Sequence, residues 1–371
     1  MKEIVFAGSR PFTLGVELEF QILDRQTLDL VPRAPALLAE APPSVQDKVA
    51  PEFMRSILEI QTDVCGSVDQ VAEDLKFSIP LLEKIAAEHE SLLYSASLHP
   101  FAEPGDQVLS VGERYQRIMD ELQYVGRQFI SQGMHVHVGI EDRDAVIGVC
   151  DSLQVYLPIL LAISCSSPYF KGEDTGFCSY RTKLFEALPL AGIAGYIGSW
   201  QGYLDEIDLL REARVIRDIK DLWWDVRPSP GFGTVEIRIC DIPSRFVEVL
   251  GLTSLIQALS AAFVEGLVPP TRVSQQILRC NKWQAARHGL DGRFNDALGL
   301  LPTRNQSLRE AARELMVVLR PFFDTFGGRG LDAVWNLLDD RISAGRQREL
   351  MKQHGRFETM ITKMQETYWY E

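Results

Sequence analysis

Three short segments, far apart in the chain, alternate apolar residues with acids, histidines or arginine. Residues 13–23 read TLGVELEFQIL, residues 133–139 read GMHVHVG and residues 234–242 read TVEIRICDI. Alternate side chains of a β-strand point to opposite faces of the sheet. Each segment is therefore expected to form a strand with one buried face and one polar face.

The remaining patterns place helices between and after these strands. Further strands are predicted at 56–61 and 94–99, and helices at 67–90, 113–131, 144–164 and widely beyond 247. Pro80 should kink or split its helix, and 166–189 is expected to be a polar loop. These elements predict an α+β fold with a mostly antiparallel sheet. No repeat or linker interrupts the chain, so 1–371 is treated as a single domain with a helical part at 295–371.

The amino-acid composition indicates which partners the chain is expected to bind and in which compartment it is expected to lie. The formal charge is −13, which disfavours binding to nucleic acid and to anionic membranes. The six cysteines form no CxxC pair, as expected for free thiols in a reducing compartment. The start of the chain does not resemble a secretory signal, and the apolar run 153–163 is too short to span a membrane. A cytoplasmic location is therefore expected. Neither a Rossmann nor a P-loop glycine motif is present.

The polar positions of the strands form pairs two residues apart. Glu17 and Glu19 share one strand, as do His135 and His137, and Glu236 lies two residues before an arginine, Arg238. Taken singly, each pair is also compatible with a solvated strand face or a neighbouring ion pair of little energetic value.

Considered together, the pairs indicate a metal site. Glu52 and Glu59 flank a further predicted strand. If the strands share a sheet, one face carries five carboxylates, two imidazoles and one guanidinium. Such a face repels itself unless divalent cations with oxygen ligands neutralise it, and Mg²⁺ commonly shares its ligands with substrate phosphates.

Two further segments offer candidate binding residues. In the loop 166–189, Ser179 and Arg181 are suited to phosphate or carboxylate oxygens. In DLWWDVRPSP, Trp224 with its neighbour Trp223 could frame a pocket, and Arg227 could clamp a substrate carboxylate. A core tryptophan and a turn-capping arginine are equally compatible with that second motif.

Several of these motifs, in this order, resemble the glutamate–cysteine ligase type 2 family. The segments that carry the resemblance are TLGVELEF, ERYQRI, GMHVHVG, SPYFKGEDTGFCSYR and DLWWDVRPSPGFGTVEIRICD, and NKWQAARHGLDG extends it, so that it covers about 12–292. The E-x-E, H-x-H and E-x-R pairs are also distantly similar to glutamine synthetase. The resemblance implies a curved antiparallel sheet that forms an active-site funnel flanked by helices, as in glutamine synthetase and guanidino kinases.

The resemblance also implies roles for individual residues. Arg238 would stabilise the transferred phosphoryl group, His137 would face phosphate, and Ser179 and Arg181 would contact nucleotide or substrate. The implied metal ligands are Glu17, Glu19, Glu52, Glu59, His135 and Glu236. Some relatives carry an acid where Arg55 stands, so this chain departs from them at that position.

The activity implied by the resemblance is that of an ATP-dependent carboxylate–amine ligase. Glutamate would be activated as an acyl phosphate and joined to an amine, with weak glutamate–cysteine ligase activity and with Mg²⁺, or Mn²⁺ in its place, as cofactor. The implied assembly is a homodimer that binds only small molecules, and no cysteine is expected to be catalytic. A guanidino-kinase-like phosphotransferase, a non-catalytic protein that binds ATP and metal on the same fold, and a metal-dependent hydrolase remain alternatives.

Overall fold

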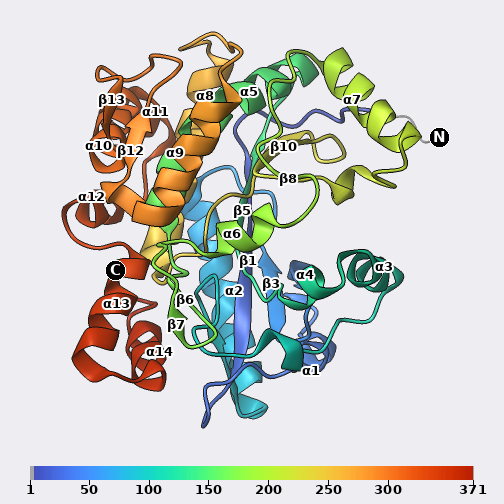
Figure 1. Cartoon of the computed structure of the whole chain (residues 1–371), viewed down its shortest axis with the longest axis vertical. Helices are drawn as coiled ribbons and strands as arrows, with labels where there is room; N and C mark the ends of the chain where they lie inside the picture. The colour runs from blue at the N-terminus through green and yellow to red at the C-terminus, as the bar shows by residue number, and fades with distance from the viewer. Residues whose placement is uncertain (1–3, 371) are drawn as a thin grey trace.

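A seven-stranded antiparallel sheet forms the centre of the computed structural model, which describes residues 4–370 (Figure 1). The strands run in the order β10–β11–β5–β1–β3–β2, and β4 pairs with the last part of β1. They are β1 (Leu14–Asp24), β2 (Val49–Pro51), β3 (Ile57–Gln61), β4 (Ser91–Tyr94), β5 (Met134–Gly139), β10 (Val226–Ser229) and β11 (Thr234–Ile237). The predicted α+β fold with an antiparallel sheet is therefore confirmed.

Helices and three small two-stranded ribbons complete the described part of the chain. The ribbons pair β6 (Tyr169–Phe170) with β7 (Glu173–Asp174), β8 (Ala191–Gly192) with β9 (Trp223–Trp224), and β12 (Arg293–Asn295) with β13 (Asn305–Ser307). The helices are α1 (Ala34–Glu40), α2 (Val68–Glu88), α3 (Glu113–Leu122), α4 (Tyr124–Arg127), α5 (Arg143–Ser164), α6 (Arg181–Glu186), α7 (Trp200–Glu212), α8 (Phe246–Val264), α9 (Gln275–His288), α10 (Leu308–Val318), α11 (Arg320–Phe326), α12 (Leu331–Asp339), α13 (Ser343–His354) and α14 (Phe357–Glu366).

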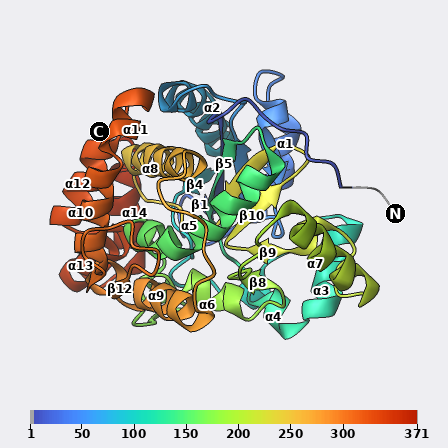
Figure 2. The same cartoon turned by 90° about the horizontal axis from the view of Figure 1, so that it is seen from above.

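One face of the sheet packs against α2, α5 and α8. The alternating residues Leu14, Val16 and Leu18 of β1 are buried in the main core, together with Val136 and Val138 of β5. Burying one such side chain contributes roughly 1.5–3 kcal/mol. Helices α10, α12 and α13 lie outside α8, on the side away from β10 (Figure 2). The apolar face is thus covered by helices, and the acids and histidines of the strands lie on the opposite face.

Two helices of the described chain, α5 and α8, are long and apolar enough to cross a membrane by length and composition alone. Their most apolar windows are 94% and 89% buried inside the fold. Burial to this extent is what the core helices of a folded domain show, and the run 153–163 lies within α5 as the buried helix that its sequence predicts.

Pro80 does not split its helix, which was one of the two outcomes expected for it. Helix α2 begins after Ser67, whose side chain accepts a hydrogen bond from Gln70 N, and it continues through Pro80 to Glu88. Leu75, before the proline, and Leu82, after it, are both fully buried. Packing of this apolar stripe outweighs the loss of one backbone hydrogen bond.

The strand predicted at 94–99 is also misplaced, because β4 ends at Tyr94. Residues 95–99 make only isolated backbone contacts, in which Gln132 N donates to Ser97 O and Leu98 forms a single bridge with Ser131, and they also bond to side chains. Ser97 N donates to Ser166 Oγ, and Ser97 Oγ accepts from Ile242 N at 2.7 Å. Serine hydroxyls compete with backbone ladders in this way. The segment therefore leaves the sheet and ties it to the loop after α5.

Two other segments have more internal structure than predicted. The helix expected at 113–131 is interrupted at Gln123, whose positive φ of 49° separates α3 from α4. The segment 166–189, expected as a loop, contains the β6–β7 ribbon and α6. The strand expected at 234–242 ends earlier, at Ile237, so Arg238 lies just beyond β11.

Candidate active site

A cavity of about 580 Å³ lies on the polar face of the sheet. It brings together the five predicted carboxylates, both histidines and Arg238. Their side chains come from β1, β3, β5, β11 and the segments that follow or precede them, and they are Glu17, Glu19, Glu52, Glu59, Glu236, His135, His137 and Arg238. The spatial convergence that the strand patterns predict is therefore present.

The histidine strand β5 pairs with β1 so that Glu17 lies between the two imidazoles. Glu17 is the register partner of His135, and its Oε2 lies 3.0 Å from His135 Nδ1. Its other oxygen, Oε1, lies 3.3 Å from His137 Nε2. His137 Nδ1 in turn lies 2.8 Å from Thr234 Oγ1, which fixes the ring orientation. One carboxylate thus contacts both histidines.

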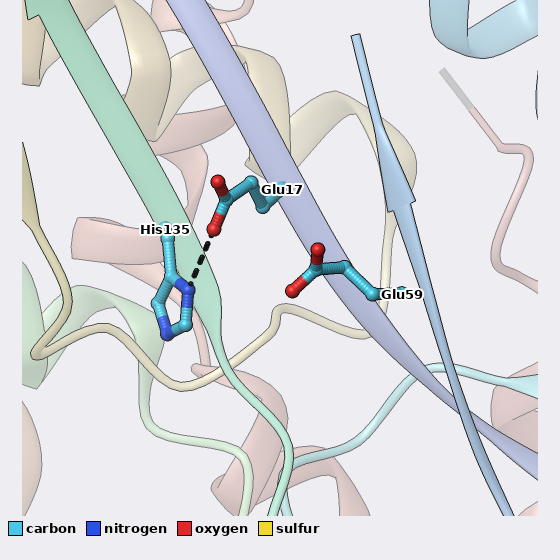
Figure 3. A group of neighbouring side chains, drawn as sticks. All are labelled: Glu17, Glu59 and His135. Carbon is cyan, nitrogen blue, oxygen red and sulfur yellow. Dashed lines mark hydrogen bonds and ion pairs between the residues drawn. The ribbon is translucent and has the colours of Figure 1, made fainter. Parts of the chain in front are cut away.

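Strand β3 contributes a further acid, Glu59, to the polar face of the sheet. Glu59 is the register partner of Glu19, and Figure 3 shows Glu59, Glu17 and His135 converging from three adjacent strands. Glu19 Oε2 accepts a 2.6 Å hydrogen bond from Gly133 N. Glu52 Oε2 accepts one from Phe53 N. These backbone donors fix the carboxylates without neutralising them.

Three groups of side chains have ligand atoms that all lie within 4.8 Å of one another. The groups are Glu17 with Glu59 and His135, Glu17 with His137 and Glu236, and Glu19 with Glu52 and Glu59. Carboxylate-rich sets of this kind suit hard divalent cations such as Mg²⁺. Two acids, Glu17 and Glu59, each belong to two of these groups.

The charges in this cavity are not balanced. Burial and the charge of Glu52 raise the pKa of Glu19 to about 8, and burial with the charges of Glu52, Glu17 and Glu19 raises the pKa of Glu59 well above its usual value. Burial and the charge of Arg238 lower the pKa of His135 to about 4. Divalent cations would relieve this repulsion, so the residues present fit a magnesium site.

Glu236 differs from the other acids because two arginines hold it. Arg227 Nε and Nη2 donate to its two oxygens at 2.8 and 3.1 Å, and Arg238 Nη1 donates to Oε1. Burial opposes ionisation of Glu236, but the charges of Arg238 and Arg227 outweigh it and lower its pKa. Arg227 Nη1 also donates to Leu222 O. The guanidinium expected to clamp a substrate carboxylate is therefore occupied in orienting Glu236.

Ser179 and Arg181 lie behind the cavity and do not line it. Ser179 Oγ donates to the buried carboxylate of Asp241 at 2.9 Å. Arg181, 3% exposed, donates to Ile239 O and Arg238 O. This placement does not fit direct contact with nucleotide or substrate. It fits support of the backbone that carries Arg238.

Trp224 was expected to frame the pocket, but Trp223 is the tryptophan that lines it. Trp224 is buried and its ring contacts Tyr203 at 6.4 Å between centroids, while Trp223 lines the cavity. The reason is the strand geometry of β9, where successive side chains point to opposite sides. Arg55 is outside the cavity lining, and its Nε donates to Leu109 O.

Some lining residues carry no sequence signal that singles them out. They come from α3, the segment after α4, α6, the segment before β9 and the turn between β10 and β11, and include Arg114, Tyr115, Phe129, Phe185, Lys220 and Phe232. A helix face or turn becomes part of a cavity only through tertiary packing. None of the six cysteines, all of which lie within residues 4–370, is among the lining residues.

Replacing Glu59 with glutamine is expected to stabilise the metal-free protein. The amide keeps the shape of the side chain but removes a buried charge that three other acids repel. At pH 8 in EDTA, the free energy of unfolding in urea should rise on the order of 1 kcal/mol. Because the folded-state pKa is raised, the gain should vanish near pH 4, where Glu59 is protonated in both states. An unchanged or lower stability at pH 8 would contradict this charge balance.

The sequence is similar to known proteins over most of its length. A model of the glutamate–cysteine ligase family 2 (GCS2) matches residues 13–303. A protein of Gloeobacter violaceus named "Putative glutamate--cysteine ligase 2" is 40% identical over 308 residues, covering 81% of this chain and 83% of that protein. A protein of the same name from Thermobifida fusca is 37% identical, covering 95% and 90%.

Solved structures with low sequence identity share the fold. The glutamate–cysteine ligase of Francisella tularensis, in complex with AMP, matches with a TM-score of 0.70 at 14% identity, covering 98% of this chain and 90% of that one. A bifunctional glutathione synthetase of Pasteurella multocida matches with a TM-score of 0.73 at 14% identity, covering 96% and 52%. At this identity the likeness extends to the fold alone.

Proposed function

Because the chain belongs to glutamate–cysteine ligase family 2, it is an ATP-dependent ligase that forms a C–N bond, and we propose that it activates the γ-carboxylate of glutamate as an acyl phosphate. The observation that carries the proposal is the single cavity in which five carboxylates, two imidazoles and Arg238 converge from adjacent strands. Such a set suits a triphosphate bound through cations, with a carboxylate placed beside its terminal phosphoryl group.

The proposed reaction has two steps. A carboxylate oxygen of glutamate attacks the γ-phosphorus of ATP, the bond from that phosphorus to the bridging oxygen breaks, and ADP leaves. The amine nitrogen then attacks the acyl carbon, the C–O bond to phosphate breaks, phosphate leaves and the amine loses a proton. No protein nucleophile takes part. The protein contributes position and charge.

Mg²⁺ bound by Glu17, Glu19, Glu52, Glu59, His135 and Glu236 would supply positive charge for the phosphate oxygens. Among the residues themselves, Arg238 would stabilise the charge on the transferred phosphoryl group. Arg227 keeps Glu236 ionised and correctly placed. His137, held by Thr234, faces the phosphates. Weak activity with cysteine would mean that another amine is the preferred acceptor.

The test is a screen of acid and amine pairs for nucleotide products, with and without Mg²⁺. The expected products are ADP and phosphate, formed only when acid and amine are both present. Glutamate labelled with ¹⁸O in its γ-carboxylate should transfer label to the released phosphate. Hydroxylamine in place of the amine should give a hydroxamate.

Other products would indicate other reactions. AMP and pyrophosphate would mean that the carboxylate is activated as an adenylate. A stable phosphorylated amine would indicate a phosphotransferase of the guanidino-kinase type. Turnover of a substrate without nucleotide would indicate a hydrolase.

A further inference from the structure

The ligand groups of the cavity follow one another in a line between two apolar ends. The group of Glu17, His137 and Glu236 lies nearest the turn between β10 and β11, and the group of Glu19, Glu52 and Glu59 lies at the other end. A nucleotide with its phosphates along this line must place its base at one of the two ends.

The end beyond Glu19 and Glu52 is lined by apolar side chains, which are buried or partly buried. The rings of Phe129 and Phe185 meet edge to face at 4.6 Å between centroids, and Leu188 and Ile118 are buried against the same cavity. An acyl phosphate hydrolyses if water reaches it, so the reacting carboxylate belongs in the enclosed part of a site. The apolar end therefore suits the reacting carboxylate, and the unreactive base belongs at the other end.

An exposed aromatic ring stands at that other end. Phe232 lies in the turn between β10 and β11 and lines the cavity, yet it is 69% exposed. Its ring centroid lies 5.7 Å from that of His137, with the two planes at 88°. His137 therefore contacts Phe232 at an edge-to-face angle, and much of the phenylalanine surface remains accessible to a planar group.

The segment before β1 holds this turn in place. Ala7 N donates to Pro230 O at 2.9 Å, and Ser9 Oγ donates to Phe232 O at 2.9 Å. A Cβ on Gly233, whose φ is +65°, would lie 2.3 Å from the Gly8 carbonyl carbon. The exposed ring therefore projects from a turn whose backbone is held by two hydrogen bonds from the segment before β1.

We propose that Phe232 is the stacking platform for the base of ATP, and that it sets the direction in which the nucleotide lies along the carboxylates. The inference rests on the ligase function proposed above. Stacking uses the π-face that every base has, so the platform favours bases that stack strongly, the purines, over pyrimidines. Phe232 is thus a residue that determines specificity for the nucleotide, and Ser9 positions it.

Replacing Phe232 with alanine is expected to weaken binding of ADP, in the presence of Mg²⁺, by about tenfold in calorimetry. Binding of inorganic tripolyphosphate, which has no base, should stay within about twofold of the wild type. The preference for ADP over CDP should shrink toward equality in the variant. Phe232→Trp should retain or strengthen ADP binding, and Ser9→Ala should weaken it in the same direction by a smaller factor.

The control is Phe77→Ala, which removes a 52% exposed phenylalanine from α2 and should leave all three affinities unchanged. Equal weakening of ADP and tripolyphosphate by Phe232→Ala would overturn the proposal, as would unchanged ADP binding. Calorimetry with the full chain needs no turnover. A wild type that binds ADP but forms no product with any acid and amine would therefore contradict the proposed function and leave the stacking result readable.

Discussion

Replacing Arg238 with alanine is expected to slow the formation of ADP by about 10²–10³-fold, the loss typical of one group that stabilises a transition state. Within residues 4–370, Glu236 is the only hydrogen-bond partner of this guanidinium. Several of its five N–H groups therefore remain for phosphoryl oxygens. Arg227 has fewer N–H groups left for a ligand, because its Nε, Nη1 and Nη2 all donate within the protein.

The variant should remain folded because Glu236 keeps its bidentate partner Arg227. The measurement is kcat and KM for ATP at saturating acid and amine, with circular dichroism to confirm folding. Arg238→Lys keeps the charge but loses the planar fork, so an intermediate loss is expected. Arg313→Ala, which breaks an exposed pair with Asp339, is the matched control and should be active. A loss below tenfold in kcat for Arg238→Ala would show that the guanidinium acts elsewhere.

The part of the site that could be predicted from sequence is the part built from strands. A period of two fixes which side chains share a face, so Glu17 with Glu19 and His135 with His137 could be assigned to one face before the pairing order was known. The ion pair of Arg227 with Glu236 was not predicted, although the same reasoning applies to it. Arg227 is the register partner of Glu236 across the β10–β11 hairpin, and a cross-strand ion pair was derivable from the short turn between them.

The remainder depends on tertiary packing, which local patterns do not encode. Arg181 follows a polar loop, but the absence of a side chain on Gly133 lets its guanidinium pass behind the sheet, where a Cβ would approach Arg181 Nη2. Phe232 has the sequence context of a turn, and its position over His137 comes from contacts with the chain before β1. Pro80 shows the same limit for helices, since burial on both sides of it overrides local preference.

Replacing Glu17 with glutamine is expected to cost about 10³-fold in turnover, more than the loss of an acid that serves one ligand group. Glu17 belongs to two of the three groups, and each of its oxygens contacts a different imidazole. The amide is a weaker ligand, and its NH₂ group faces a histidine nitrogen in either orientation. One substitution therefore disturbs two of the three ligand groups and the placement of His135 and His137.

The same substitution should abolish most of the stabilisation that Mg²⁺ confers. For the wild type, Mg²⁺ at 100 times its dissociation constant should add about 2.7 kcal/mol to the free energy of unfolding, seen as a rise in Tm. The matched control is Glu83→Gln. Glu83, which lies on α2 and not in the cavity lining, is also partly buried and accepts a hydrogen bond from Trp369 Nε1. If Mg²⁺ raised the Tm of Glu17→Gln as much as that of the control, cation binding would have to depend on Glu19, Glu52 and Glu59 alone, and Glu17 would serve only to orient the histidines.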